Sequence, residues 1–219
     1  MYRRVFSGII DQGKTSAFLA AMRESNRYQA ERGIRARTTV WSSMTGRANA
    51  VQIASDFNTL DDLEKFTELA ALDASFSSFR RAVRAQMQFP ATQVTILRLA
   101  YHSAGLITSE EATTPRKYLR MVTGDVQAGR HREFVMSVSQ ALEYQKQRGI
   151  EATTSVWTLV TGSTSGVAVL AEFDSLGELE KYDDLSVQDA EFGRLRKTAR
   201  ETMVFTTSET QLMRNLRQA

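Results

Sequence analysis

The sequence predicts an α+β protein made of two tandem βαββαβ repeats, the split βαβ arrangement of ferredoxin-like folds. The first observation is that sliding the chain against itself by 116 residues aligns its halves without a gap, so that Tyr28 falls on Tyr144 and Trp41 on Trp157. The second is that both copies show the same order of strand and helix patterns. The third is a polar linker between them. We therefore divide the chain into a repeat at 1–100, a linker at 101–116 and a repeat at 117–219.

Each repeat opens with a stretch rich in aromatic and branched residues, Tyr2–Ile10 and Tyr118–Val126, which predicts a strand. A glycine turn and a helical stretch follow, at about residues 14–32 in the first copy. Gly33 and Gly149 come just after this helix in the two copies, where a left-handed cap favours glycine. The repeats therefore begin as strand, turn and helix.

The rest of the first repeat continues the pattern, and the second repeats it 116 residues later. We predict strands at about 35–45 and 49–57, a short helix at 60–68, a longer helix at 73–87 and a last strand at 92–99. Asp73 and Asp189 precede the longer helices and are predicted N-caps, because their carboxylates can accept bonds from free backbone N–H groups. A repeat of about 116 residues has the size of a whole small domain.

Composition excludes several kinds of function. The 28 basic and 25 acidic residues give a net charge of +3 without a basic patch, so nucleic-acid binding is not expected. The absence of cysteine excludes disulfides and thiolate metal sites. No apolar stretch suits a signal peptide or a membrane span. We expect a cytoplasmic protein without membrane contact.

Several residues shared by the repeats resemble a known family. The pattern is a tryptophan-bearing strand, a Thr-Gly turn, a strand that ends in an aromatic residue, a helix start with leucine, and an Asp-x-x-Phe helix. In the first repeat it reads Trp41, Thr45-Gly46, Val51, Phe57, Leu60, Asp73 and Phe76, and the second repeat matches it throughout. These residues resemble NIPSNAP-like proteins of the dimeric α/β-barrel superfamily, although an alanine follows the aspartate where the family usually has proline.

The resemblance implies two sheets packed face to face as a barrel within one chain. It also implies a range of activities, because the superfamily includes cofactor-independent monooxygenases, cyclases, isomerases and heme-binding proteins. Fold alone does not choose among them.

Alternation along the strands separates the side chains that lie under the helices from those on the other face. Val40 and Val156 mark the helix side of the second strand, so Trp41 and Trp157 should face away from the helices. In the first strand we assign Val5 to the helix side. The predicted ligand-binding residues share the opposite face: Tyr2, Arg4, Thr39, Trp41, Ser43, Gln52 and Asp56 in the first repeat, and Tyr118, Arg120, Ser155, Trp157 and Glu172 in the second.

Structural roles compete with ligand binding for several of these residues. Neighbouring antiparallel strands would bring Arg4 to Asp56 and Arg120 to Glu172, which predicts structural ion pairs. The tryptophans can equally fill an interface. Arginines four residues apart on the last helix of each repeat, such as Arg196 and Arg200, are typical of a solvated face.

No cofactor or metal is expected. His102 and His131 are the only histidines, they are not duplicated, and neither lies in the second helical region from which heme-binding relatives supply their ligand. No cluster with metal-ligand spacing is present. Two functions remain: a cofactor-independent enzyme acting on an aromatic or polyketide-like metabolite, or a NIPSNAP-like binding or scaffold protein without catalysis. The expected partners are a small-molecule ligand and a second copy in a homodimer.

Overall fold

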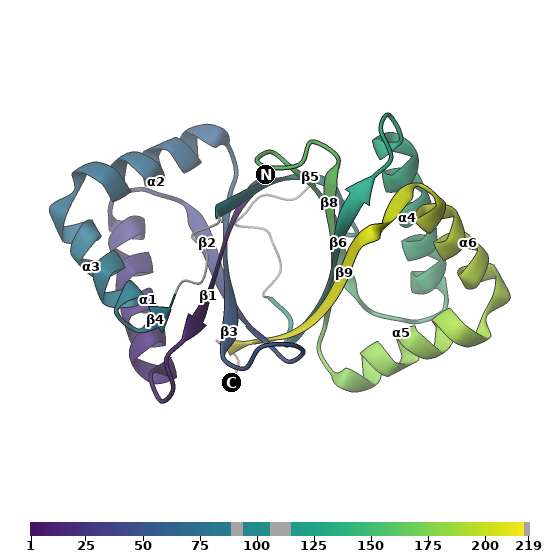
Figure 1. The fold of residues 1–219 in the computed structure, drawn as a ribbon, viewed down its shortest axis with the longest axis horizontal. Helices are drawn as coiled ribbons and strands as arrows, with labels where there is room; N and C mark the ends of the chain where they lie inside the picture. The colour runs from purple at the N-terminus through teal and green to yellow at the C-terminus, as the bar shows by residue number, and fades with distance from the viewer. Residues whose placement is uncertain (89–93, 106–114, 217–219) are drawn as a thin grey trace. The chain divides into compact units, whose positions relative to one another are not determined.

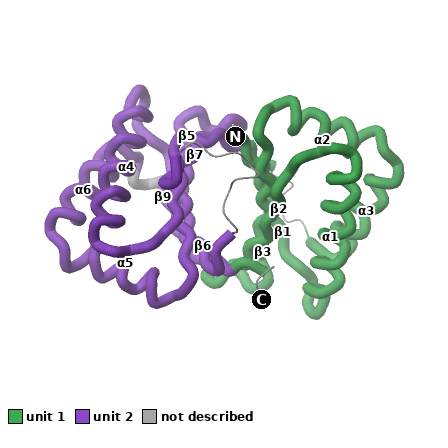
Figure 2. Tube along the Cα trace, turned by 180° about the vertical axis from the view of Figure 1, so that it is seen from behind, with its two compact units in different colours: residues 1–96, 107–113, 215–219 green, residues 97–106, 114–214 purple. Residues whose placement is uncertain are grey.

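The computed structural model describes residues 1–88, 94–105 and 115–216. These form two compact units (Figure 2). Of the described residues, unit 1 contains 1–88, 94–96 and 215–216, and unit 2 contains 97–105 and 115–214. The α+β class and the tandem ferredoxin-like repeat are confirmed.

Unit 1 is an antiparallel sheet covered on one face by helices (Figure 1). Its elements are β1 (Tyr2–Ile10), α1 (Thr15–Glu31), β2 (Ala36–Ser43), β3 (Ala50–Phe57), α2 (Leu60–Leu72), α3 (Ala74–Arg84) and β4 (Met87–Gln88). The strand order is β2-β3-β1-β4, so β1 and β3 lie side by side as the split βαβ pattern requires.

Unit 2 repeats this arrangement and adds a strand at one edge. Its elements are β5 (Val94–His102, of which the part from Leu97 belongs here), β6 (Tyr118–Val126), α4 (His131–Gln147), β7 (Thr153–Leu159), β8 (Gly166–Phe173), α5 (Leu176–Gln188), α6 (Ala190–Glu201) and β9 (Met203–Asn215). The strand order is β9-β6-β8-β7-β5. The last strand of the first repeat therefore pairs with the second repeat.

Side-chain caps begin the helices that follow the central strands. Thr59 and Ser175 each accept a hydrogen bond from the backbone N–H three residues on, at the starts of α2 and α5. Asp73 does the same at the start of α3 and Asp189 at the start of α6, as predicted. Gly33, at φ 72°, occupies the left-handed conformation that follows α1.

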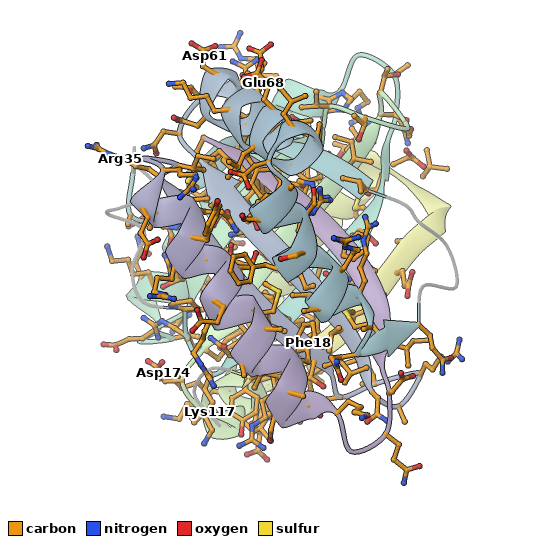
Figure 3. The ribbon with its side chains drawn as sticks, turned by 90° about the vertical axis from the view of Figure 1, so that its left-hand side faces the viewer. Phe18, Arg35, Asp61, Glu68, Lys117 and Asp174 are labelled. Carbon is orange, nitrogen blue, oxygen red and sulfur yellow. The ribbon has the colours of Figure 1, made fainter. Side chains whose placement is uncertain are left out.

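The core of each unit lies between its sheet and its helices. In unit 1 the fully buried Phe18 of α1 packs with Val40 and Val51 of the sheet, and Figure 3 looks onto this helical layer with Phe18 labelled. In unit 2 Phe134 of α4 packs with Val156 and neighbouring apolar residues. The predicted helix side of β2 and β7 is therefore confirmed.

Several predicted boundaries change, and the short helix predicted at 60–68 extends to Leu72. The helix predicted to reach Met87 ends at Arg84, because Met87 enters β4, pairs with Ile10 and is buried in the unit 1 core. The strand predicted at 92–99 runs from Val94 to His102, and its first predicted residues lie outside the described residues, as does most of the linker. Within the described ranges, none of the helices has both the length and the apolar character needed to cross a bilayer.

Candidate functional site

A cavity of about 370 Å³ lies between the sheet and the helices of unit 2. Its walls come from α4, α5 and α6 on one side and from β6, β7, β8 and β9 on the other. Most of the lining is apolar, with Phe134, Phe192 and Tyr182 as its aromatic members. This volume lies within the range of sites for small organic molecules.

A smaller cavity of about 70 Å³ occupies the same place in unit 1. Each of its lining residues, moved by 116 positions, falls on a residue that lines the unit 2 cavity. The two cavities are therefore equivalent features of the two repeats. Their lining residues can be compared position by position.

Several side chains that line the unit 2 cavity are smaller than their unit 1 counterparts. Four apolar pairs differ in this direction, from unit 1 to unit 2: Phe6 and Val122, Met22 and Val138, Ile53 and Val169, Val83 and Ala199. Each change removes methylene groups or a ring from the space between sheet and helices. The cavity opens to solvent beside the exposed Arg200, so water or a ligand occupies this space.

Two polar partners present in unit 1 are missing from unit 2. In unit 1 the Gln29 amide donates to the Ser25 backbone oxygen at 3.2 Å and to its Oγ at 3.4 Å. The Thr38 and Ser55 hydroxyls are 3.0 Å apart. In unit 2 alanine stands at both serine positions, Ala141 and Ala171.

Gln145 and Thr154, the counterparts of Gln29 and Thr38, are 2% and 1% exposed. Gln145 Oε1 and Thr154 Oγ1 have no hydrogen-bond partner in the described part of the chain, and both residues line the cavity. Among the described residues of unit 1 there is one such atom, Asn26 Oδ1, at a position occupied by Leu142 in unit 2. Buried polar atoms without protein partners are rare in native proteins, and a bound water or ligand can satisfy them.

Three arginines reach the unit 2 cavity: Arg120 from β6, and Arg196 and Arg200 from one face of α6. The Arg120 Cζ lies 5.2 Å from the Tyr182 ring centroid. The Arg196 Cζ lies 5.6 Å from the Tyr182 centroid and 5.8 Å from that of Phe192. Aromatic faces attract cations, so the rings hold these guanidinium groups in place.

No described carboxylate forms an ion pair with any of these three arginines. Burial lowers the pKa of Arg196, and the charges of Arg200 and Arg120 lower it further, while Tyr182 and Asp183 act in the opposite direction. The cavity is thus strongly electropositive.

Unit 1 keeps the same three cations as Arg4, Arg80 and Arg84. Burial, followed by the charges of Arg80 and Arg84, lowers the pKa of Arg4 to about 10. Its guanidinium lies 5.4 Å from the Phe66 ring centroid. Both cavities therefore have the same three arginines, but they differ in volume.

The residues predicted to bind a ligand separate into two groups. Arg4 and Arg120 line the cavities under the helices. Trp41 and Trp157 are buried on the other face of their sheets and line neither of these cavities. The Trp157 indole N–H donates to the Ser155 hydroxyl at 2.8 Å.

The remaining predicted residues also lie outside these two cavities, and their role in ligand binding stays a prediction. They are Tyr2, Thr39, Ser43, Gln52 and Asp56 in the first repeat, and Tyr118 and Glu172 in the second. Ser43 already bonds to the Thr45 backbone oxygen, and Glu172 accepts the Arg116 backbone N–H at 3.1 Å.

The predicted Arg4–Asp56 ion pair is wrong. Arg3 pairs with Asp56, with Nε to Oδ1 at 2.6 Å and Nη2 to Oδ2 at 2.9 Å. The register places Arg3 opposite Asp56 and Arg4 opposite Ser55, so Arg4 points to the helix side and Val5 does not. Tyr2, opposite the buried Phe57, shares the helix side, as does Tyr118 opposite Phe173, so the predicted face of these tyrosines is also wrong. One step along a strand exchanges its faces.

The same error affects the second repeat. Leu119 lies opposite Glu172, and Arg120 lies opposite Ala171 on the helix side. Arg120 therefore lines the cavity and does not pair with Glu172.

The solvated-face interpretation of the helix arginines is correct only in part. Arg84 and Arg200 are exposed, whereas Arg80 and Arg196 are half-buried and line the cavities. Their spacing from Phe76 and Phe192, four residues earlier on the same helix face, was a usable signal, because residues four apart share a face.

The donor set does not fit heme or a metal ion. No histidine or carboxylate is among the described residues that line the unit 2 cavity. No group of metal-ligating side chains occurs elsewhere in the described ranges.

Similarity to known proteins is structural. No protein-family model matches the chain, and no curated protein matches it. A Fusobacterium nucleatum protein named as a candidate monooxygenase superposes with a TM-score of 0.66 at 10% identity, over 98% of this chain and 92% of its own. An anthrone oxidase-like protein gives 0.64 at 12% identity, over 98% and 91%.

A heme-binding protein of Thermus thermophilus gives a TM-score of 0.54 at 9% identity, over 98% of this chain and 90% of its own. Proteins with different names thus share this architecture. At these identities the similarity establishes the fold alone. The chain shares the ferredoxin-like α+β fold of these proteins.

Proposed function

We propose that this chain binds a small organic molecule in the cavity of unit 2. The observation that carries the proposal is the contrast between the two copies of the cavity. In unit 2 several lining side chains are smaller, and Gln145 Oε1 and Thr154 Oγ1 have no hydrogen-bond partner among the described residues, whereas the equivalent cavity of unit 1 is about one-fifth as large. A fold tolerates such a void more easily when a ligand occupies it.

The size and lining of the cavity favour a flat ligand of two or three rings. A volume of about 370 Å³ equals on the order of a dozen water molecules, at roughly 30 Å³ each. Phe134, Tyr182 and Phe192 offer aromatic contacts. Gln145 and Thr154 offer a hydrogen-bond acceptor and a hydroxyl group to a polar substituent.

A titration with N-phenylnaphthylamine tests this proposal. The neutral dye fluoresces strongly in apolar surroundings, so we expect saturable enhancement with the natural protein. The matched control is the triple variant Val122→Phe, Val138→Met and Ala199→Val, which installs side chains that unit 1 already packs at the equivalent positions.

The filled variant should unfold at the same temperature as the natural protein or higher, and it should lose the enhancement. Equal enhancement by the natural protein and a well-folded filled variant would place the dye elsewhere and contradict the proposal.

Catalysis is the second candidate, favoured by the structural neighbours named as a candidate monooxygenase and an anthrone oxidase-like protein. We propose anthrone as its first test substrate: one anthrone and one O₂ give one anthraquinone and one water. Formation of anthraquinone should depend on an open unit 2 cavity. Binding without turnover would favour a NIPSNAP-like binding or scaffold protein, since the described lining holds no carboxylate or histidine to act as general base.

The other expectations stay proposals. A cytoplasmic setting and a homodimer rest on the sequence and on the resemblance, and so do ligand contacts by the predicted residues around Trp41 and Trp157.

A further inference from the structure

We infer that the ligand of the unit 2 cavity is an aromatic anion whose acidic group is held by Arg196 with Arg120 and Arg200. This inference rests on the proposed function, because it specifies the chemical class of the molecule that fills the cavity.

Charge is the first argument. The three guanidinium groups reach one cavity, and no described carboxylate pairs with them or lines the same space. Cations that share a partly desolvated space repel one another, and a bound anion removes that repulsion. Guanidinium groups bind carboxylate, sulfonate or phosphate oxygens through paired, charge-assisted hydrogen bonds.

The positions of the arginines are the second argument. Arg200 is exposed, Arg120 and Arg196 are half-buried, and Gln145 and Thr154 are almost fully buried. The cavity therefore reaches from solvent-accessible cations to neutral polar atoms in the interior. A molecule with an acidic group and an apolar body matches this order.

The sheet sets the reach of such a molecule. Arg120, Ala171 and Thr154 lie opposite one another on three successive strands, with Ala171 between the other two. Two strand spacings separate the backbones of Arg120 and Thr154 by about 10 Å. An aromatic skeleton with an acidic group on one side and a hydroxyl on the other spans such a distance, and inorganic phosphate does not.

The three arginines alone do not carry this inference. Unit 1 has the equivalent Arg4, Arg80 and Arg84 around a cavity of only about 70 Å³, where aromatic rings contact the buried cation. In unit 2 the same charges surround open space and buried atoms without partners. Unit 1 therefore supplies a matched control for each arginine.

Calorimetry with a matched pair of probes tests the charge requirement. A naphthalene carboxylate and the corresponding carboxamide have nearly the same shape and differ in charge. We expect the natural full-length protein to bind the carboxylate at least about tenfold more tightly, as a charge-assisted hydrogen bond predicts. Arg196→Gln should remove the preference and retain carboxamide binding, which also shows that the variant folds.

Two further variants locate the effect. Arg196→Lys should retain part of the preference for the carboxylate, and Arg80→Gln, the equivalent change in unit 1, should leave it unchanged. Equal affinity for the two probes, or an equal loss in Arg80→Gln and Arg196→Gln, would overturn the inference. So would N-phenylnaphthylamine binding without binding of either probe, and that result leaves the proposed function standing. If none of the three compounds binds, the proposed function fails with it.

Discussion

Arg3 and Asp56 form a two-bond ion pair across β1 and β3, with their side chains 12% and 5% exposed. Burying a charge is costly unless a partner compensates it. The repeat in unit 2 manages without this pair, because Leu119 stands at the position equivalent to Arg3. At this position the first repeat therefore uses an arginine in an ion pair, and the second repeat uses an apolar leucine.

Arg3→Leu should therefore lower the free energy of unfolding by about 3 kcal/mol, since it leaves the Asp56 carboxylate buried without its guanidinium. Urea denaturation monitored by circular dichroism measures the change. The double variant Arg3→Leu and Asp56→Leu should recover most of the loss. A single variant as stable as the natural protein would show that the ion pair contributes little.

Asp73 and Asp189 each cap a helix and also bind a tyrosine and an arginine. The Asp189 carboxylate accepts the Phe192 backbone N–H at 2.9 Å and the Tyr144 hydroxyl at 3.0 Å, and lies 2.9 Å from the Arg148 guanidinium. The backbone hydrogen bond to Phe192 is the main cause that lowers the pKa of Asp189, with the Tyr144 bond and the Arg148 charge adding to it.

A lowered pKa in the folded state gives stability that is present above the unfolded value, about 3.9 for aspartate, and is lost as the pH falls through the folded value. Melting temperatures measured downward from about pH 5 should therefore fall steeply in the acid range. Asp189→Asn should flatten this fall, because asparagine still caps the helix and does not titrate. A parallel displacement of the whole profile would mean that charge at this position does not matter.

Residue orientation was predictable only where one face of a strand is clearly apolar. In β2 the buried Val40 marks the helix side, so the next residue, Trp41, is placed on the opposite face. In β1 both alternations contain apolar and polar residues, Arg4 and Phe6 on one and Val5 and Ser7 on the other. The register with β3 decides between them, and the sequence of β1 alone does not contain that information.

Gly124 is the point at which β6 and β9 change register. A side chain there would place its Cβ 2.9 Å from Met203 Cε and 3.3 Å from Ser208 Cα. The register shifts between Thr123 and Asp125, so the missing side chain allows β9 to bulge past β6. Met203 and Ser208 also line the cavity, which links this bulge to the candidate site.

Gly124→Ala should lower the free energy of unfolding by about 1–3 kcal/mol, because the new methyl group meets backbone as well as a flexible methionine. It should also weaken N-phenylnaphthylamine binding by moving Met203 and Ser208. Gly177→Ala is the control, since its Cβ would meet only Ser175 Oγ at an ordinary 3.8 Å. If Gly124→Ala is as stable as the control, the bulge tolerates a side chain.

Local sequence predicted the presence of each helix and strand more reliably than the residue at which it ends. Asp73 has the side chain of an N-cap, and the structure confirms α3 and its counterpart α6 at these residues. The pairing of Met87 with Ile10 in β4 depends on a strand far away in sequence. Local propensity cannot report such a contact, so the helix was predicted three residues too long.

Each compact unit contains chain from both repeats. Residues 97–102 of β5 pair with β7 in unit 2, although β5 is the last strand of the first repeat. Leu216, near the end of the second repeat, packs against the core of unit 1. The duplication was visible as self-similarity, whereas this exchange was not, because sequence similarity does not identify the partner of an edge strand.

The exchange predicts how fragments behave. A fragment of residues 97–219 keeps β5 on β7, whereas one of residues 117–219 leaves β7 as an exposed sheet edge. The longer fragment should be more soluble and should melt at a higher temperature, by gel filtration and circular dichroism. Equal behaviour would mean that β5 contributes little to unit 2.

The difference in size between the two cavities bears on how many ligand molecules one chain can bind. In an assembly of identical subunits, a substitution that opens a pocket opens it in every subunit at once. Here the copies are encoded separately, so Ala199 can widen the unit 2 cavity while Val83 keeps the unit 1 cavity narrow. Under the proposed function such a polypeptide would bind one molecule and not two, and its narrower half preserves the larger side chains that would reduce the wider cavity.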